Sequence, residues 1–466
     1  MSFPTIEFAA FFAVVFVLSW ALMPHPSAWR PFILVASYLF YGWVDWRWVP
    51  LLMASSVVNT VAARVIARSP SPVTRKRALV AAIAFDLGLL CVFKYLGFFV
   101  SEMDGALESI GLGSPLPLVQ IVLPIGISFF TFQAISYVVD VYRGETRAAS
   151  LGDVAFLQAF FPHLVAGPIV RANELLPQLR TPRDPRTVLA GPAIFLIVGG
   201  VLKKTVIADE LARRVVDPVY SDPGAHSGAE LTLAFYAFAA QIYCDFSGYT
   251  DMAIGLALLL GFQLPQNFNR PYLALSLRDF WRRWHMTLSR WLRDYLYIPL
   301  GGNRGGRRRT YLNVMLTMLL GGLWHGAAWT FVIWGGIHGA GLSVERWTRE
   351  RFGGFRVPAG VAWLVTFHVV CVAWVFFRAP DLGTAFDVLG GLGLSGPAPL
   401  VTLPLVLLVV TAVAVQTLPP GWWRQAEAWL VARPVGLQGL AVGALLVVAD
   451  AAVGQQGVAP FIYYQF

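Results

Sequence analysis

The chain has 466 residues, of which 57% are hydrophobic and only 13% are charged, and its mean hydropathy is +0.63. A water-soluble protein usually carries about twice that share of charge, so the composition excludes a soluble globular protein and predicts a chain that lies largely in lipid. The net charge of +9 does not point to nucleic acid, because the basic residues gather in short loops between apolar runs, as the positive-inside rule predicts.

Apolar stretches long enough for helices recur along the whole chain. They are 5–23, 31–45, 48–67, 78–100, 117–140, 153–170, 187–206, 230–262, 311–336, 358–378, 400–418 and 437–454. A helix needs about 20 apolar residues to cross a bilayer, and open sheet edges are not satisfied in lipid. We therefore predict an all-α polytopic membrane protein of one domain, 1–466, with about eleven crossings and some re-entrant or horizontal helices.

Loop charges predict the orientation of this bundle. Basic residues cluster around the third loop, at Arg64, Arg68, Arg75, Lys76 and Arg77. The loop 101–118 holds only acidic charges. The basic loop is expected in the cytoplasm and the acidic one outside. The first stretch, which has no basic leader and no Ala-x-Ala site, is expected to stay as a helix with the N-terminus on the periplasmic side.

The three cysteines and most histidines receive structural interpretations. Cys91, Cys244 and Cys371 lie far apart in apolar runs, without a Cys-x-x-Cys or His-Glu-x-x-His pattern, so we expect inert buried thiols and no metal site. The histidines expected to be structural are His25, His163, His226, His338 and His368. His338 follows an expected break at Gly335–Gly336, and a hydrogen bond to a neighbouring helix would explain His368.

The core of the functional prediction is the segment 241–338, which does not behave like lipid-facing helix. It begins QIYCDFSGYTDMAIG, with Asp245 in an apolar stretch. Carboxylates inside a membrane are costly and usually face a cavity or a partner. In an unbroken helix Asp245 would share a face with Gln241 and Tyr249. The alternative is that Asp245 or a nearby serine caps a helix break at Gly248.

The next stretch carries seven charged residues between Arg278 and Asp294, so it does not suit a membrane span. Large apolar residues still recur at helical spacing: Trp281, Trp284, Leu288, Trp291 and Tyr295. The pattern predicts an amphipathic helix at the cytoplasmic interface or inside a protein-lined pore, with His285 on its apolar side. Its basic face would attract either an anionic donor such as a coenzyme phosphate or lipid headgroups. Residues 301–309 are expected to form a flexible basic loop.

A single histidine then occupies a stretch without charge. From Tyr311 to Gly336 there is no Asp, Glu, Lys or Arg, and His325 is flanked by glycines and alanines. Small residues let helices approach closely or leave room for a substrate. A structural role is the alternative, but an imidazole is expensive to keep in a membrane. Held uncharged, it would suit a general base that takes a proton from a hydroxyl attacking a thioester. We expect direct transfer, and a covalent intermediate stays open.

Several of these segments together resemble the membrane-bound O-acyltransferase (MBOAT) family, in its bacterial alginate O-acetyltransferase branch. The matching pieces are FFPHLVAGPIVR (160–171), QIYCDFSGYTDMAIG (241–255), NFNRPYLALSLRDFWRRWHMTLSRWLRDYLYIPLGGN (267–303), GGLWHGAAWTFVIWG (321–335) and FIYYQF (461–466). They follow the family's order over most of the chain, so their combination is far more specific than any single motif.

The resemblance implies a bundle of about eleven helices around a central tunnel, with funnels from both sides. It implies that His325 is the essential histidine and His285 the second one. By analogy Asp245, Asn269 and Arg283 line or brace the tunnel, and we add Trp324 and Tyr249 to that set. The family takes an acetyl group from a cytoplasmic thioester, here expected to be acetyl-CoA, with no permanently bound cofactor. It passes the group across the inner membrane to a periplasmic SGNH-type partner that acetylates an exopolysaccharide such as alginate.

Other functions stay open at this point. The same scaffold is expected to serve acetylation of cellulose or peptidoglycan, or transfer of D-alanine. A transporter or flippase without chemistry of its own would have the same number of spans. It would be expected to show paired repeats of broken helices, and the two halves of this sequence do not resemble each other.

Overall fold

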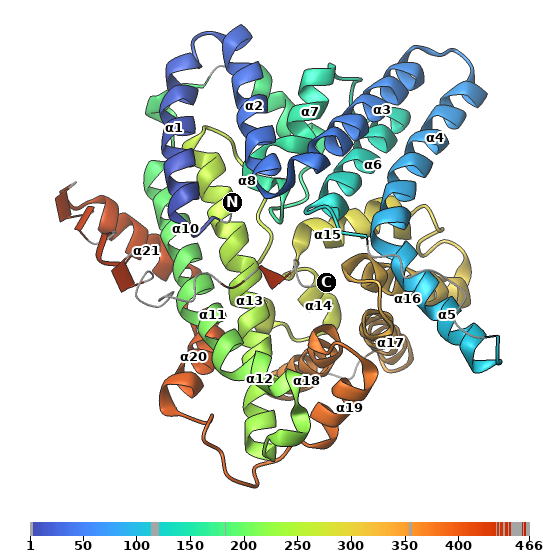
Figure 1. The fold of residues 1–466 in the computed structure, drawn as a ribbon, viewed down its shortest axis with the longest axis vertical. Coiled ribbons are helices and arrows are strands. Elements are labelled where there is room, and N and C mark those ends of the chain that lie inside the picture. Colours follow the sequence, from blue (N-terminus) through green and yellow to red (C-terminus); the bar gives the residue numbers. More distant parts are fainter. Residues whose placement is uncertain are drawn as a thin grey trace. The chain divides into compact units, whose positions relative to one another are not determined.

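The computed structural model describes residues 3–112, 121–181, 183–353 and 357–434, with short stretches beyond them up to Ile462. Every regular element in these residues is a helix (Figure 1), which confirms the all-α prediction. The chain forms two compact units, Met1–Val188 with Ala257–Leu264, and Leu189–Leu256 with Pro265–Phe466. The single domain and its core segment 241–338 stay predictions, and that segment lies in the second unit except for residues 257–264.

The first unit is built from helices α1 to α9. Their bounds are α1 Ile6–Leu22, α2 Pro26–Asp45, α3 Val49–Arg68, α4 Pro72–Leu90, α5 Leu96–Ser109, α6 Ile127–Arg143, α7 Leu151–Ala159, α8 Phe161–Leu164 and α9 Ala172–Arg180. Helix α3 packs on α4, α6 and α7, and Figure 1 shows α3, α4 and α6 side by side. Hydrogen bonds join their buried faces, since Ser55 and Asn59 of α3 donate to Asp86 of α4 over 3.1 and 3.2 Å. Such bonds hold apolar helices together in lipid.

The second unit contains the remaining helices. They are α10 Ala190–Leu202, α11 Asp209–Leu211, α12 Asp217–Ser221, α13 Gly228–Leu259, α14 Leu277–Trp281, α15 Met286–Trp291, α16 Gly306–His325, α17 Trp329–Arg351, α18 Ala359–Arg378, α19 Leu382–Gly390, α20 Leu403–Ala414 and α21 Pro420–Val431. Two π-helical turns, Lys203–Ala208 and Ala212–Val216, join α10, α11 and α12 into one continuous stretch. Turns of this type are frequent at functional sites.

Helix α13 is unbroken over 32 residues, so the alternative of a helix break at Gly248 is wrong. The glycine serves close packing instead, because an added Cβ would come within 2.7 Å of the Gly200 carbonyl oxygen and 3.1 Å of the Lys203 Cβ. Gln241, Asp245 and Tyr249 therefore share one helix face as predicted, beside the π-helical turn that carries Lys204.

Four helical stretches are long and apolar enough to cross a membrane among the described residues: Pro26–Arg68, Pro72–Ser109, Ala190–Ser221 and Ala359–Arg378. A fifth is possible if Leu403–Thr417 and Gly421–Val431, bent by 97°, count as one span. These spans support a membrane-embedded protein, whereas the count of about eleven stays a prediction. Most of the predicted span 437–454 lies outside the described residues, as do residues 113–120 before α6.

The cysteine prediction is partly wrong. Cys244 and Cys371 are buried, but Cys91 is exposed on the surface of the chain. It lies within the candidate span Pro72–Ser109, so its apolar sequence context reflects a helix surface rather than a core.

Candidate active site

The stretch 311–336 forms the closed end of a helical hairpin, and its prediction as one span is wrong. Helix α16 ends at His325 and α17 begins at Trp329, after an extended connection. The two helices run antiparallel, because Gly322 meets Phe331, Gly335 meets Met318 and Gly339 meets Met315. A Cβ at Gly335 would collide with the Met318 carbonyl oxygen, which is the close approach that small residues permit.

His325 therefore lies at the hairpin tip, residues 324–329, rather than in the middle of a span. The side chain is 3% exposed, and its ring centroid lies 5.0 Å from Trp324, 4.9 Å from Trp334 and 5.2 Å from Phe377. The carbonyl end of a helix favours positive charge. The end of α16 thus favours the charge that the His325 imidazole would acquire on taking a proton.

The predicted amphipathic helix is interrupted at His285, so the continuous helix is wrong. Helix α14 ends at Trp281 and α15 starts at Met286, while His285 itself has φ 41° and ψ 54°. A non-glycine residue in the left-handed region is strained, and such strain gathers at functional sites. The break turns the fully buried His285 ring toward the hairpin tip, 6.1 Å from the Trp324 ring.

Asn267 fixes the orientation of His285 and was not predicted. Its Oδ1 accepts from the Thr287 backbone N–H over 3.2 Å and from the Thr287 hydroxyl over 2.9 Å. Because a backbone N–H only donates, the Asn267 atom must be oxygen. The His285 Nδ1, 3.1 Å from that oxygen, therefore carries the hydrogen. Burial lowers the pKa of His285 to about 3, so the ring is neutral and Nε2 is the basic nitrogen.

Asp245 takes part in a buried ion network, and its predicted role of lining or bracing a tunnel stays a prediction. Lys204 Nζ lies 2.8 Å from Asp245 Oδ1 and 2.8 Å from Asp209 Oδ1. The C-terminal segment supplies two more donors, since the Ala459 N–H donates to Asp209 and the Ile462 N–H to Asp245, over 3.2 and 2.8 Å. Buried charges persist only when paired and hydrogen-bonded, and this network meets that condition. The sequence did not predict the ion pair of Lys204 with Asp245, because the two residues are 41 positions apart.

The other predicted tunnel residues divide into two groups. Trp324 and Tyr249 are buried; Trp324 lies between the two histidines, and the Tyr249 ring is 4.7 Å from Phe461. Asn269 is exposed, and its backbone N–H donates to the Arg283 carbonyl. Arg283 is about one-third exposed and pairs with Asp279 over 2.9 Å. The structure thus gathers His285, Trp324 and His325, while the roles of Asn269 and Arg283 stay predictions.

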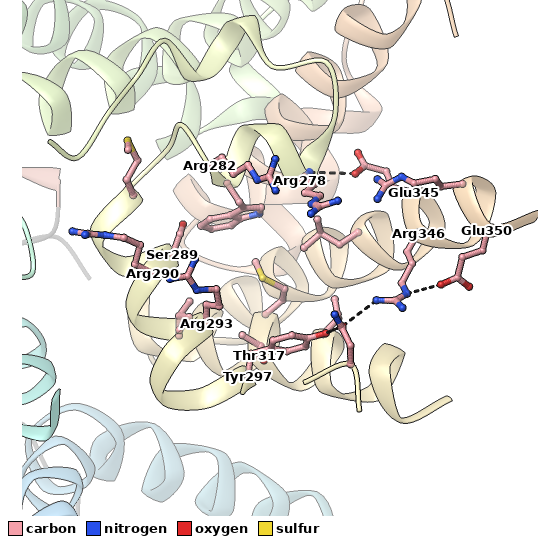
Figure 2. Close-up of a pocket in the computed structure, with 18 residues that line it drawn as sticks. Arg278, Arg282, Ser289, Arg290, Arg293, Tyr297, Thr317, Glu345, Arg346 and Glu350 are labelled. Carbon is pink, nitrogen blue, oxygen red and sulfur yellow. Dashed lines mark hydrogen bonds and ion pairs between the residues drawn. The ribbon is translucent and has the colours of Figure 1, made fainter. Parts of the chain in front are cut away.

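A basic pocket opens at the other end of the hairpin, which we call the mouth and which contains Gly306 and Arg351. The pocket has a volume of about 680 Å³, within the range of small-molecule sites. Its charged lining comprises Arg278, Arg282, Arg290, Arg293, Arg346 and Arg349, with Glu345 and Glu350, an excess of four positive charges. Figure 2 shows Glu345 next to Arg278, and Arg346 reaching toward Glu350, whereas Arg290 extends away from them.

Helix α14 is held at this pocket by Glu345 of α17. The Glu345 carboxylate accepts the N–H groups of Leu277 and Arg278, which caps the start of α14. Burial raises the pKa of Glu345. The positive charge of Arg282 lowers the pKa of Arg278, so the arginines repel one another. An anion bound among them would relieve that repulsion.

The basic segment 301–309 is only partly a loop. Helix α16 already begins at Gly306, so Arg307, Arg308 and Arg309 form its first turn, where the helix dipole disfavours positive charge. Glu350 of α17 compensates, because its carboxylate lies 2.8 Å from Arg307 and 2.8 Å from Arg346. The flexible loop predicted there is therefore wrong for residues 306–309.

Two structural interpretations of histidines are confirmed and one is incomplete. His163 Nε2 lies 2.9 Å from the Leu157 carbonyl oxygen, and His368 Nε2 lies 2.9 Å from the Tyr236 hydroxyl of α13, the neighbouring helix that was expected. The break expected at Gly335–Gly336 is absent, because α17 is continuous there. His338 consequently belongs to the hairpin and is completely buried.

A helical membrane protein with a buried imidazole and an anion-attracting pocket on one hairpin fits the class of membrane-embedded group-transfer enzymes. Residues 153–379 match the model of the membrane-bound O-acyltransferase family, MBOAT. A probable alginate O-acetylase AlgI of Azotobacter vinelandii is 43% identical over 373 residues, covering 78% of this chain and 72% of the relative. Its counterpart in Pseudomonas putida is 40% identical over 464 residues, covering 93% and 94%. The peptidoglycan O-acetyltransferase of Helicobacter pylori is 39% identical over 404 residues, covering 80% and 74%.

These similarities settle the class. The chain belongs to the membrane-bound O-acyltransferase family, and it is an acyltransferase. The resemblance carried by the sequence motifs is thereby confirmed.

Proposed function

We propose that this chain transfers an acetyl group from a cytoplasmic thioester to an acceptor hydroxyl on the periplasmic side of the inner membrane, for O-acetylation of an exopolysaccharide such as alginate. The observation that carries the proposal is that one hairpin, α16–α17, bears both the basic pocket at its mouth and His325 at its tip. A large anionic donor and a neutral base are the two parts that this reaction needs.

The donor in this proposal is acetyl-CoA. Its phosphates match the arginine excess of the pocket, and guanidinium groups bind phosphate oxygens strongly. The pocket reaches Thr317 and Met318 on α16, and Met318 lies seven residues before His325, about 10 Å along a helix. A long flexible arm that carries the thioester would cover that distance while the phosphates stay at the mouth.

His325 acts as the general base. The acceptor oxygen attacks the thioester carbonyl carbon while His325 takes the hydroxyl proton. The carbon–sulfur bond then breaks and the proton passes to the departing thiolate, so the products are an ester and a free thiol. His285 presents Nε2 as a hydrogen-bond acceptor that orients the substrate. The aromatic side chains around His325 keep water away from the thioester.

The membrane arrangement supports the direction of transfer. The basic loop around Arg75 would lie in the cytoplasm and the acidic loop 101–118 outside, which leaves the N-terminus in the periplasm. About eleven crossings, some of them re-entrant, would then surround a tunnel. Donor and acceptor would meet at His325 from opposite sides, so that only the acyl group crosses. A periplasmic partner of the SGNH type would place the acetyl group on the polymer.

Peptidoglycan is the second candidate polymer. It is favoured by the 39% identity to a protein named peptidoglycan O-acetyltransferase, whereas alginate is favoured by two relatives of 40% and 43% identity. Both candidates use the same donor side, and the ester content of each purified polymer distinguishes them.

Replacing His325 tests the proposal directly. In cells whose own copy is deleted, the variant His325→Ala should leave the polymer without acetyl esters, since a positioned base contributes about 100- to 10,000-fold. The control variant His25→Ala removes an exposed histidine far from the hairpin in sequence and should acetylate normally. Immunoblots of the membrane fraction check that both variants are present in equal amounts. Normal acetylation by His325→Ala would end the proposal.

A further inference from the structure

A wall of aromatic side chains separates the basic pocket from His325, and a third buried histidine lies within it. Trp281 lines the pocket, and its ring lies 5.7 Å from Trp334 and 5.1 Å from His338. Trp334 in turn lies 4.9 Å from His325. One indole therefore lines the pocket, and the next indole contacts His325.

The arrangement follows from the register of α17. Trp334, His338 and Leu342 succeed one another at intervals of four residues, so they lie on one face of the helix. Leu342 lines the pocket and Trp334 contacts His325. His338, between them, is the only polar side chain of the three that carries both a donor and an acceptor nitrogen.

The wall contains polar groups whose bonding capacity the described protein residues do not use. Within the described ranges, neither ring nitrogen of His338 has a hydrogen-bond partner, and the same holds for the indole nitrogens of Trp281 and Trp334. His338 is fully buried and Trp334 is 1% exposed. Leaving such a group unbonded in a buried place is costly, and a cluster of them is expected where a polar ligand binds.

Aromatic rings pack against the His338 ring, and these contacts leave its two nitrogens available for hydrogen bonds. Phe280 stacks on it with an interplanar angle of 7° and a centroid distance of 6.1 Å, and Trp334 meets its edge at 4.8 Å. Burial keeps the ring neutral, with one N–H and one basic nitrogen. Together with the two indole N–H groups, it offers three donors and one acceptor.

We infer that His338 is a positioning residue for the donor, and that with Trp281 it forms a gate recognising the amide-bearing arm of an acyl thioester. This inference rests on the proposed function. The carbonyl oxygen of an amide accepts from the indole N–H groups, and its N–H donates to the basic nitrogen of His338. Trp281, half-buried at the pocket wall, moves aside as the arm enters. The thioester then reaches His325 past Trp334.

The experiment compares two uncharged acetyl thioesters with the full-length chain in nanodiscs. S-acetylpantetheine carries two amides in its arm, and S-ethyl thioacetate carries none. Release of free thiol in the presence of a saturating polysaccharide hydroxyl acceptor gives KM and kcat for each donor. The variants are His338→Phe, which keeps an aromatic ring, His338→Gln, which keeps a donor and an acceptor, and Trp281→Phe, which removes the indole N–H.

The variants are expected to change KM for one donor and leave KM for the other donor unchanged. His338→Phe should raise KM for S-acetylpantetheine about tenfold, the effect of about one lost hydrogen bond, while leaving S-ethyl thioacetate unchanged. Trp281→Phe should act in the same direction, and His338→Gln should restore KM to within about threefold of the parent. An equal rise for both donors, or no rise for either, overturns the inference and leaves the proposed function intact. A parent chain that consumes acetyl-CoA but neither of these thioesters also overturns the inference, whereas a parent chain that does not consume acetyl-CoA either overturns the proposed function.

Discussion

The two ends of the α16–α17 hairpin differ in their side chains, which are aromatic at the tip and charged at the mouth. At the tip, His325 is 3% exposed and is surrounded by the rings of Trp324, Trp334 and Phe377. At the mouth, six arginines and two glutamates line a pocket of about 680 Å³. A charged ligand group is favoured only at the mouth, and a neutral reaction centre is favoured only at the tip. The contrast separates binding of the donor's charge from the chemistry on its acyl group.

This separation predicts different kinetic effects for substitutions at the two ends of the hairpin, and these effects test it. Substitutions near the tip should lower kcat, because they alter groups that act in the transition state. Substitutions at the mouth should raise KM for a charged donor and leave kcat unchanged, because the phosphates bind equally well in ground and transition states. A substitution with the opposite effect would break the comparison.

Asn267 offers the largest effect of this kind. In the variant Asn267→Leu, Oδ1 no longer accepts from His285 Nδ1, so the ring can turn and present the wrong tautomer. We expect kcat to fall by about 100-fold, with KM for acetyl-CoA little changed. Thiol release from acetyl-CoA by the chain in nanodiscs, with a saturating polysaccharide hydroxyl acceptor present, measures both constants.

The matched control is Asn267→Asp, which keeps an acceptor oxygen for Thr287 and His285. The added negative charge should raise the pKa of His285 and bring the acid limb of the kcat profile into a higher pH range. A thermal melt of each variant separates loss of fold from loss of orientation. Equal kcat for the leucine and aspartate variants would contradict the role assigned to Asn267.

The sequence predicted more about the tip than about its surroundings. His325 and His285 stand out because a lone imidazole in an apolar run is costly, and family motifs surround both. The residues that hold the site in place did not stand out in the sequence. Asn267 looked like its exposed neighbour Asn269. The ion pair of Lys204 with Asp245 depends on the packing of α13 against a π-helical turn. Such partners are set by tertiary contacts between residues distant in the chain, which one sequence does not reveal.

The secondary structure shows the same limit. The apolar run 311–336 has the length of one crossing, yet the chain folds back within it at Gly326–Ala328. Helix α16 begins before this run and α17 ends after it. The regular spacing of Trp281, Trp284 and Leu288 predicted one helix, but His285 breaks it in a left-handed conformation. In both cases a site residue lies at the end of a helix, where hydrophobic periodicity carries no signal.

At the mouth, Arg282→Ala should produce a moderate effect on KM alone. Removing one guanidinium that faces the pocket should raise KM for acetyl-CoA about three- to tenfold at low salt, and less at high salt, because charges near the surface are screened. S-acetylpantetheine has no phosphate and should show no change. The control Arg304→Ala removes an exposed arginine that does not line the pocket and should leave both values unchanged. A fall in kcat would instead place Arg282 in the chemistry.

The smallest effect is expected at the rim, where Glu350 joins the ends of both helices. Hydrogen bonds from Arg307, and then from Arg346, lower the pKa of Glu350 below its usual 4.5. A lowered pKa means that the pairing stabilises the fold above the unfolded pKa and is lost as pH falls through the folded one. The melting temperature of the parent should therefore slightly exceed that of Glu350→Gln at neutral pH. The two values should converge as the pH is lowered below about 4. Because the carboxylate is exposed, the difference should also shrink in high salt. A difference that survives acid or salt would show that Glu350 stabilises the hairpin through packing rather than charge.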